Sequence, residues 1–404
     1  MLAALSEGAC RFEGALAALD TRATASCLRS LGIAVGPLSE RRALTVRGGG
    51  LRAFRRPGGS LDCRNSGTTA RLLMGLLAAH RFTATLTGDA SLRRRPMARI
   101  AGPLGDMGAA IRTTDGRLPV TIRGGALRSI DYVSPVASAQ VKTALLFAGL
   151  AGGVGVRVTE PVRSRDHTER LLTMLGVRCA VRGRSVTLEP VERLPAFGGT
   201  IPGDFSSAAY LVAAAILAGD SELEILGVNV NPTRTGFLGA LARMGARVAQ
   251  DGAATSLGEP VATLRPLPHT TAPLTPVEVS PAEIPAMVDE VVLLACLASR
   301  AEGTSVFRGV GELRVKESDR LALVARNLNA VGARAHTEGD TLWVEGTDAP
   351  PRGHVETAGD HRLAMSFAVL GTIPGARVRL DDRDCVAVSY PGFFGMLKRI
   401  LRRA

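Results

Sequence analysis

The chain has 404 residues, of which 46% are hydrophobic and 21% are charged, a balance that indicates a globular protein with a large core and excludes a disordered one. Its net charge of +12 favours an anionic partner, but the arginines are dispersed and one Trp and three Tyr provide few stacking surfaces for bases. We therefore expect no nucleic acid as partner. The longest apolar run, residues 210–218, is too short to span a bilayer, and the amino terminus lacks a signal peptide's basic flank. These features predict a soluble cytoplasmic protein with no membrane contact.

Cysteine spacing and chain length limit the architecture further. Six cysteines lie far apart without a C-x-x-C pair, which predicts reduced, buried thiols and neither disulfides nor a zinc site. The length favours two or three domains. Residues 195–204 are rich in proline and glycine and lie midway along the chain. We therefore expect two domains, residues 1–202 and 203–404.

A short pattern recurs along the chain, in which a helical stretch ends in an apolar residue and a glycine before a strand-like run. The glycines are Gly32, Gly108, Gly176, Gly245 and Gly332. Glycine adopts the left-handed conformation beyond a helix without steric cost, so each is predicted to end a helix. More apolar helices are expected between them, at residues 67–79, 138–150, 206–219, 289–301 and 360–370. A repeat of about 70 to 80 residues indicates an α/β protein built from copies of one supersecondary unit.

Small polar or acidic residues precede each of these apolar helices. Taken singly, each opening is an ordinary N-cap. Taken together, the openings place positive helix ends at equivalent positions of every copy. If the copies pack around a pseudo-axis, these ends converge on one anion-binding space. Both interpretations remain open from the sequence.

The segment GELRVKESDR, residues 311–320, is the most densely charged part of the pattern. Ser318 is the expected N-cap of the following helix, so Lys316 and Glu317 would lie on the turn that enters it. A cation, a carboxylate and a helix N-terminus suit an anionic substrate whose protons must move, whereas the alternative is a solvated helix start. The 49 basic residues include only three lysines: Lys142, Lys316 and Lys398. Because a compact ammonium differs from a planar guanidinium, a lysine kept under this bias is expected to have a local role.

Eight motifs then occur in order along nearly the whole chain: LDCRNSGTTARLLMGLLA (61–78), GDASLRRRPM (88–97), SAQVKTALLFAGL (138–150), SRDHTERLL (164–172), PGDFSSAAYLVAAA (202–215), GELRVKESDR (311–320), GDHRLAM (359–365) and VAVSYPGFF (386–394). This set resembles the EPSP synthases (5-enolpyruvylshikimate-3-phosphate synthases) of the enolpyruvyl transferase family. The resemblance implies an α/β fold with two similar domains, each of three βαβαββ-type repeats in an inside-out barrel, and an active site in the interdomain cleft. It also implies that the first domain, whose first repeat is incomplete, holds shikimate 3-phosphate, and that the second holds phosphoenolpyruvate and the catalytic carboxylates.

The reaction implied by the resemblance transfers the enolpyruvyl group of phosphoenolpyruvate to the 5-hydroxyl of shikimate 3-phosphate and releases phosphate. No metal or organic cofactor is expected, and the family favours a monomer. By resemblance, Asp289 is the base for the hydroxyl, Glu317 takes part in proton transfer at the methylene carbon, and Lys316 contacts shikimate 3-phosphate. The alternatives are an N-cap carboxylate for Asp289 and a solvated side chain for Glu317.

The resemblance also assigns substrate-binding residues. Those matched to phosphoenolpyruvate are Asn65, Gly67, Thr68, Arg95, Arg320 and Arg362, and those matched to shikimate 3-phosphate are Ser138, Ala139, Gln140 and Arg165. His361 would orient Arg362 or contact phosphate. Lys142 is either a cation behind the substrate loop or a salt-bridge partner, and the sequence does not decide between them.

Two departures from the family pattern raise competing hypotheses. The family opens with a Lys-Ser…Arg motif, which this sequence lacks, so we expect that the recorded start is internal and that this form is at least about a thousandfold less active than a full-length relative. Arg64 stands where the family usually has glycine. The alternative is a non-catalytic or weakly active homologue that binds a phosphorylated ligand. A third hypothesis, the related enzyme acting on UDP-N-acetylglucosamine, is disfavoured because residues 88–97 contain no cysteine.

Overall fold

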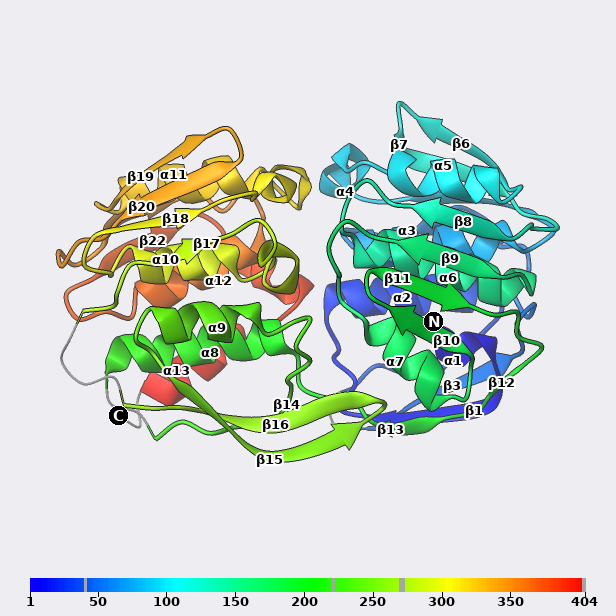
Figure 1. Cartoon of the computed structure of the whole chain (residues 1–404), viewed down its shortest axis with the longest axis horizontal. Helices are drawn as coiled ribbons and strands as arrows, with labels where there is room; N and C mark the ends of the chain where they lie inside the picture. The colour runs from blue at the N-terminus through cyan, green and yellow to red at the C-terminus, as the bar shows by residue number, and fades with distance from the viewer. Residues whose placement is uncertain (40–41, 220–221, 269–272, 402–404) are drawn as a thin grey trace. The chain divides into compact units, whose positions relative to one another are not determined.

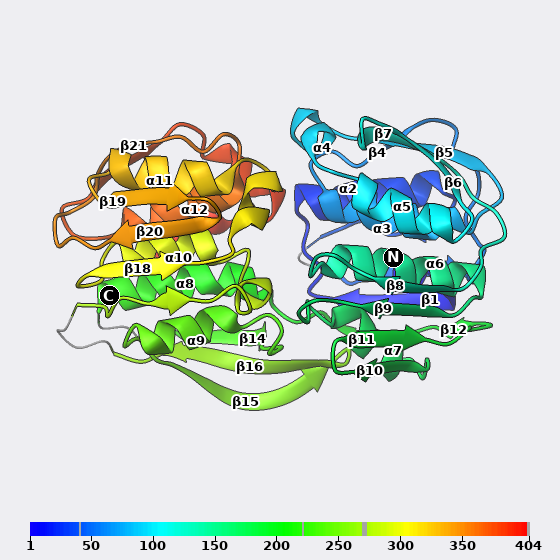
Figure 2. The ribbon, with the colours of Figure 1, turned by 45° about the horizontal axis from the view of Figure 1, so that its top comes forward.

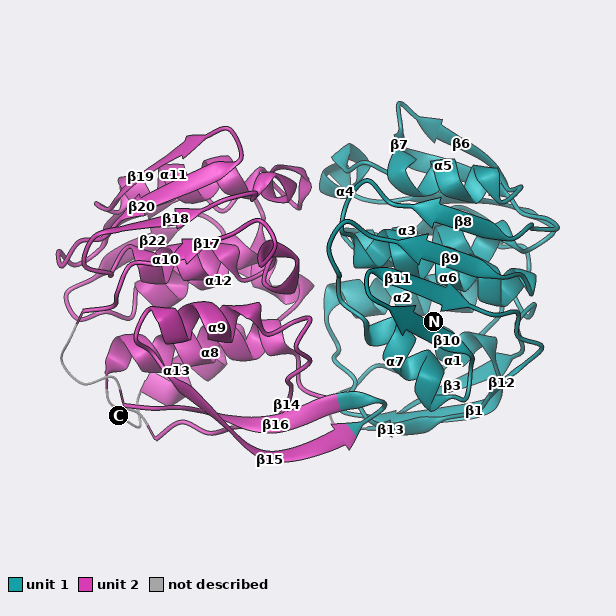
Figure 3. Cartoon of the chain, in the orientation of Figure 1, with its two compact units in different colours: residues 1–201, 256–259 teal, residues 202–255, 260–404 magenta. Residues whose placement is uncertain are grey.

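The computed structural model describes residues 1–39, 42–219, 222–268 and 273–401, and the chain divides into two compact units (Figures 1 and 3). The first unit comprises Met1–Ile201 and Ser256–Glu259, and the second comprises Pro202–Thr255 and Pro260–Ala404. Each unit has its own hydrophobic core. Within the described ranges, no helix has both the length and the apolar character needed to cross a membrane.

Two sheets of the first unit share one topology. Each contains a parallel pair of strands that continues through two antiparallel pairings. In sheet order, the strands are β4 (Leu61–Asp62), β5 (Thr83–Thr87), β7 (Arg117–Arg123) and β6 (Ala110–Thr114) in one sheet, and β8 (Ile130–Val133), β9 (Val156–Thr159), β11 (Ser185–Leu188) and β10 (Cys179–Arg182) in the other. The helices between their parallel strands are α3 (Gly67–Ala78) and α6 (Ala139–Gly152), and the helices before their hairpins are α5 (Ala98–Asp106), preceded by the short α4 (Ala90–Arg94), and α7 (His167–Met174). Each copy is therefore a βαβαββ unit, and the α/β prediction is confirmed.

The remaining sheet of the first unit is assembled from both ends of that unit. Its strands, in order, are β12 (Leu194–Pro195), β1 (Ser6–Glu13), β3 (Leu44–Gly49) and β2 (Ala34–Val35), with β13 (Gly198–Thr200) also paired to β1. Helices α1 (Leu2–Leu5) and α2 (Leu19–Ser30) flank β1 in the sequence. The strands that pair in parallel with β1 are β12 and β13, which come from the last residues before Pro202.

The second unit repeats the same topology once in full. The sheet consists, in order, of β17 (Glu278–Val279), β18 (Thr304–Phe307), β20 (Thr341–Glu345) and β19 (Arg334–Glu338), with helices α10 (Val291–Ala298) and α11 (Arg320–Ala330). Shorter copies lie on either side of it in the sequence. One contains α8 (Phe205–Ala218), β14 (Ile225–Asn229), α9 (Gly236–Arg243), β15 (Val248–Ser256) and β16 (Glu259–Pro266); the other contains β21 (Arg352–Val355), α12 (His361–Leu370) and β22 (Arg377–Leu380), followed by α13 (Phe393–Leu401). Three short 3₁₀ helices, Ile284–Ala286, Gly311–Val315 and Asp384–Val388, complete the described part of this unit.

The inner helices are packed against one another within each unit. In the first unit α3 lies beside α6, and in the second α8, α10 and α12 contact each other (Figures 1 and 2). These helices are apolar on nearly all sides, which fits burial rather than an amphipathic surface position. Polar caps and unpaired backbone groups therefore lie at their ends, and single buried charges occur inside α3 (Arg71) and α6 (Lys142).

The glycine pattern correctly predicts where helices end, but one predicted start is wrong. All five glycines have positive φ, between 77° and 113°. Ser318 is not the N-cap of α11, because the helix begins at Arg320 and the carboxylate of Asp319 accepts from the backbone N of Ala322 at 3.0 Å. The Ser318 hydroxyl instead donates to Oδ2 of Asp360 at 2.9 Å. All six cysteines are free thiols. Cys10, Cys27, Cys63 and Cys296 are buried as predicted, whereas Cys179 and Cys385 are only partly buried.

Candidate active site

In the first unit, the amino end of α3 carries a small polar network. Ser66 caps the helix, with its hydroxyl oxygen 3.2 Å from the backbone N of Thr69. Asn65 donates to Asp89 at 2.8 Å and accepts from Arg95 at 2.9 Å, so Arg95 is held in place although it is only 5% exposed. A Cβ atom on Gly67 would lie 3.1 Å from Nη1 of Arg95. Glycine at this position therefore leaves room for a buried guanidinium beside the helix end.

The same network reaches the amino end of α6 through Gln140. The amide of Gln140 donates to the hydroxyl of Thr68 at 2.9 Å and accepts from Arg71 at 2.6 Å. The predicted residues of both helix ends are thus brought together. Arg71 was missed by the sequence interpretation, although an arginine inside an otherwise apolar helix is an unusual residue that must have a polar partner.

Behind the residues at the start of α6 lies a buried cluster that we call the lysine cluster: Lys142, Glu160 and Glu169. Each is at most 3% exposed, and Nζ of Lys142 lies 3.0 Å from Glu160 and 2.7 Å from Glu169. Lys142 is therefore a salt-bridge partner. Burial raises the pKa of Glu169, with Lys142 opposing the shift. The structure places Arg165 in the segment before α7, directly after Ser164, which also contacts this cluster.

In the second unit, Asp289 lies two residues before α10 and does not cap it. The cap position is occupied by Glu290, which makes no side-chain capping bond. The carboxylate of Asp289 instead faces three guanidinium groups, at 3.5 Å from Arg320, 3.7 Å from Arg362 and 3.9 Å from Arg234. The N-cap alternative for Asp289 is therefore wrong, because its oxygens are directed toward arginines and not toward the first turn.

Arg320 joins the predicted catalytic residues to one another. Its side chain is 1% exposed, and Nη2 contacts Oε2 of Glu317. Its Nε donates to Asp360 at 2.8 Å, and Nη1 lies 3.5 Å from Asp289. One guanidinium thus contacts three carboxylates, and Glu317 and Asp289 meet different nitrogen atoms of the same cation.

Arg362 and Arg234 extend this arrangement. Nη1 of Arg362 lies 3.8 Å from Glu290, and Nη1 of Arg234 lies 3.0 Å from the same carboxylate. Ser206 links the two partners of this pair, because its hydroxyl donates to Glu290 and accepts from Arg234. We call the whole group the arginine cluster: Arg234, Arg320 and Arg362 with Asp289, Glu290, Glu317 and Asp360.

Arg234 and Glu290 were not singled out from the sequence, although the repeat contains a signal for Arg234. Gly245 follows Gly176 by 69 residues, and Arg234 follows Arg165 by the same interval. Applying the repeat to individual side chains would have identified Arg234 as the counterpart of a predicted substrate-binding residue.

Lys316 and His361 lie beside the arginine cluster, and both have lowered pKa values. Lys316 is 25% exposed in its side chain and lies 3.9 Å from Glu312. Burial lowers the pKa of Lys316, while Asp289 and Glu312 oppose the shift. Burial, assisted by Arg362, lowers the pKa of His361 to about 4, so this imidazole is neutral at pH 7.

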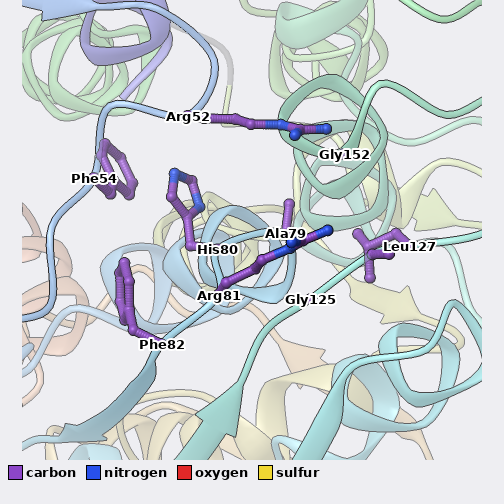
Figure 4. Close-up of a pocket in the computed structure, with 10 residues that line it drawn as sticks. Arg52, Phe54, Ala79, His80, Arg81, Phe82, Gly125, Leu127 and Gly152 are labelled. Atoms are coloured by element: carbon purple, nitrogen blue, oxygen red, sulfur yellow. The ribbon is translucent and has the colours of Figure 1, made fainter.

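A pocket elsewhere in the first unit has none of these residues. It has a volume of about 350 Å³ and lies at the carboxyl ends of α3 and α6, with His80, Phe54, Arg52 and Arg81 on its walls (Figure 4). The predicted residues at the starts of α3 and α6 lie at the opposite ends of these helices, about 18 to 21 Å away at 1.5 Å per residue. The described residues contain no group of three or more His, Cys, Asp or Glu side chains arranged to hold a metal ion.

The architecture is that of the enolpyruvyl transferases. The chain is similar in fold to the enolpyruvyl transferase NikO from Streptomyces tendae, with a TM-score of 0.76 and 21% identity over 98% of this chain and 90% of that chain. It is also similar to EPSP synthase from Acinetobacter baumannii, with a TM-score of 0.85 and 36% identity over 98% of this chain and 91% of that chain.

The sequence comparisons identify the family. The family model described as EPSP synthase (3-phosphoshikimate 1-carboxyvinyltransferase) matches residues 1–397. A 3-phosphoshikimate 1-carboxyvinyltransferase from Gloeobacter violaceus is 47% identical over 99% of this chain and 92% of that relative, and one from Xanthomonas oryzae pv. oryzae is 44% identical over 97% and 89%. The chain therefore belongs to the EPSP synthase family, and the resemblance drawn from its motifs is confirmed.

Proposed function

We propose that this chain transfers the enolpyruvyl group of phosphoenolpyruvate to the 5-hydroxyl of shikimate 3-phosphate and releases phosphate, acting as a cytoplasmic monomer. Membership of the EPSP synthase family supports this reaction. The reaction needs a base for the hydroxyl, an acid for the methylene carbon, and cations for the phosphates and the carboxylate. The arginine cluster contains all three kinds of group.

Burial within the arginine cluster is the observation that supports the division of roles most directly. Glu290 and Asp360 are 1% and 0% exposed and neutralise buried arginines. The side chains of Asp289 and Glu317 are 16% and 20% exposed and are held by the same arginines. Only carboxylates that remain accessible can exchange protons with a substrate. Burial therefore leaves Asp289 and Glu317 as the carboxylates available for proton transfer. Following the family resemblance, we assign Asp289 as the base and Glu317 as the group that transfers a proton at the methylene carbon.

The remaining residues are proposed to bind the two anionic substrates. Ser138, Ala139, Gln140 and Arg165 would bind shikimate 3-phosphate together with Lys316, whereas Asn65, Gly67, Thr68, Arg95, Arg320 and Arg362 would bind phosphoenolpyruvate. Forked guanidinium groups suit carboxylate and phosphate oxygens. The neutral His361 would hold Arg362 in position or donate to phosphate.

The test is phosphate release from phosphoenolpyruvate, measured with shikimate 3-phosphate and, separately, with UDP-N-acetylglucosamine at an enzyme concentration high enough to detect slow turnover. We expect release only with shikimate 3-phosphate. Binding of shikimate 3-phosphate in calorimetry without phosphate release would support the non-catalytic alternative instead. Phosphate release with the nucleotide sugar would refute the proposal. The proposed monomeric state is tested separately by sedimentation velocity.

A further inference from the structure

The side chain of Glu160 connects the two segments to which shikimate 3-phosphate binding is assigned. Glu160 follows β9 directly and is 3% exposed. Its Oε1 accepts from the backbone N of Ser138 at 3.1 Å and from the hydroxyl of Ser164 at 2.6 Å. Ser138 begins the loop-to-helix turn at α6, and Ser164 precedes Arg165. One buried carboxylate thus reaches both segments.

The second oxygen of Glu160 completes the set of bonds. Oε2 accepts from the backbone N of Ser164 at 3.3 Å and pairs with Lys142 at 3.0 Å. A carboxylate has about four lone-pair directions, and here four donors use them. Glu160 therefore has no free oxygen with which to bind substrate or take a proton, and its role must be exerted through the residues that it holds.

Because Glu160 binds these backbone groups, it fixes which groups the Ser138 and Ser164 segments expose to a ligand. Ser138 has an extended backbone, with φ −140° and ψ 104°, and its hydroxyl oxygen lies 3.5 Å from the backbone N of Val141, within hydrogen-bond range. With its own N–H bound to Glu160, Ser138 has a fixed orientation at the amino end of α6, where unpaired backbone N–H groups and the helix dipole favour an anion. Fixing Ser164 in the same way fixes the backbone that carries Arg165.

We propose that Glu160 is a positioning residue that sets the geometry of the shikimate 3-phosphate site by fastening the Ser138 and Ser164 segments to one buried carboxylate. This inference rests on the proposed function, because it takes shikimate 3-phosphate as the ligand of these segments. It predicts a change in substrate affinity without loss of the chemical step.

Glu169 is the matched control that the chain provides. It is also 3% exposed and pairs with the same Lys142, at 2.7 Å. It lies within α7, and neither of its carboxylate oxygens accepts a hydrogen bond from the Ser138 or Ser164 segments. A glutamine at either position removes one carboxylate from the same buried cluster, so general damage to the cluster would affect both variants alike.

The experiment compares Glu160→Gln with Glu169→Gln in steady-state kinetics. The amide in Glu160→Gln turns one acceptor oxygen into a donor that faces other donors, so we expect the KM for shikimate 3-phosphate to rise about 10- to 100-fold, as for the loss of charged hydrogen bonds. The kcat and the KM for phosphoenolpyruvate should stay within about threefold. In Glu169→Gln all three parameters should stay within about threefold of the parent chain.

Equal effects in the two variants, or a fall in kcat at unchanged KM, would overturn the inference. If Glu160→Gln does not fold, Ser164→Ala removes only the 2.6 Å hydroxyl bond and should raise the same KM about three- to tenfold. If the parent chain releases no phosphate, the proposed reaction fails separately. Calorimetric binding of shikimate 3-phosphate then decides: weaker binding in Glu160→Gln than in Glu169→Gln supports the inference, and equal or absent binding refutes it.

Discussion

The lysine cluster of the first unit and the arginine cluster of the second both lie near the amino ends of inner helices, but they differ in how far their charges are buried. In the lysine cluster the cation and both carboxylates are at most 3% exposed. In the arginine cluster Arg320 is buried, whereas Asp289 and Glu317 keep part of their surface in solvent. Complete burial suits a structural role, and partial burial leaves groups available for proton transfer.

The comparison shows that charge clusters near helix amino ends can serve two physical purposes. In the lysine cluster, Glu160 pairs with Lys142 and binds backbone N–H groups of the Ser138 and Ser164 segments. Arginines with several carboxylates can keep some of those carboxylates ionised and oriented at the surface. The four predictions below test this distinction, from the largest expected effect to the smallest.

Asp289→Asn should lower kcat about 10²- to 10⁴-fold, because an amide cannot accept the hydroxyl proton. Phosphate release measures the rate, and urea unfolding should show that the variant still folds. The matched control is Asp131→Asn, at an exposed aspartate of the first unit that lies 3.8 Å from the exposed Arg157. A kcat for Asp289→Asn within threefold of the parent would remove Asp289 from the chemistry.

Lys142→Met should reduce the free energy of unfolding by about 3–5 kcal/mol, because Glu160 and Glu169 would remain buried without their cation. Lys316→Met provides the contrast, since this lysine is partly exposed and its burial already disfavours the charged form. We expect Lys316→Met to change stability by less than about 1 kcal/mol while lowering activity. Chemical denaturation of both variants measures the difference in the free energy of unfolding. Similar losses of stability in the two variants would contradict the proposed difference between the clusters.

His361 should make folding sensitive to acid. Its pKa is lowered to about 4 in the folded chain, so below pH 6.5 the unfolded chain binds a proton that the folded chain does not bind until about pH 4. Stability therefore falls as the pH drops through this window, by about 2 kcal/mol between pH 7 and pH 5. His361→Asn should lose this part of the pH dependence in urea titrations, and an unchanged dependence would show that His361 is not the group involved.

Arg64→Gly should stabilise the chain slightly. Arg64 has φ of 50°, in the left-handed region where a side chain costs about 1–2 kcal/mol, and glycine recovers part of this cost. We expect a gain of about 0.5–1 kcal/mol in the free energy of unfolding. A loss of stability would mean that contacts of the Arg64 side chain outweigh the strain.

The sequence predicts the repeated architecture well because the signals are local. A glycine beyond a helix and a run of apolar residues each depend on a few neighbours, so Gly176 and the helix starting near Ala139 could be placed without a structure. The N-cap residue of α11 could not be predicted from the sequence, because Ser318 and Asp319 are both good capping residues and tertiary contacts decide between them. Asp360 binds the Ser318 hydroxyl, which leaves Asp319 to cap the helix.

The charged partners could be predicted only in part. The motifs identify Asp289, Glu317 and Arg320 as single positions, but they do not show that one guanidinium contacts both carboxylates, since those contacts bridge residues up to 31 positions apart. The repeat spacing marks the position of Arg234, but its pairing with Glu290, like the bonds from Ser138 and Ser164 to Glu160, joins segments that are separate in the sequence. Such pairings are set by how the repeats pack, which composition and spacing do not encode.

The most direct test of the central claim, that the accessible carboxylates of the arginine cluster carry out the proton transfer, is deuterium incorporation in ²H₂O. Protonation of the methylene carbon and its reversal introduce solvent deuterium into the enolpyruvyl methylene group of the product, which NMR detects. In Glu317→Gln we predict that incorporation and phosphate release fall together by at least about 100-fold, while calorimetric binding of shikimate 3-phosphate stays within threefold. Incorporation at the parental rate in Glu317→Gln would contradict the account.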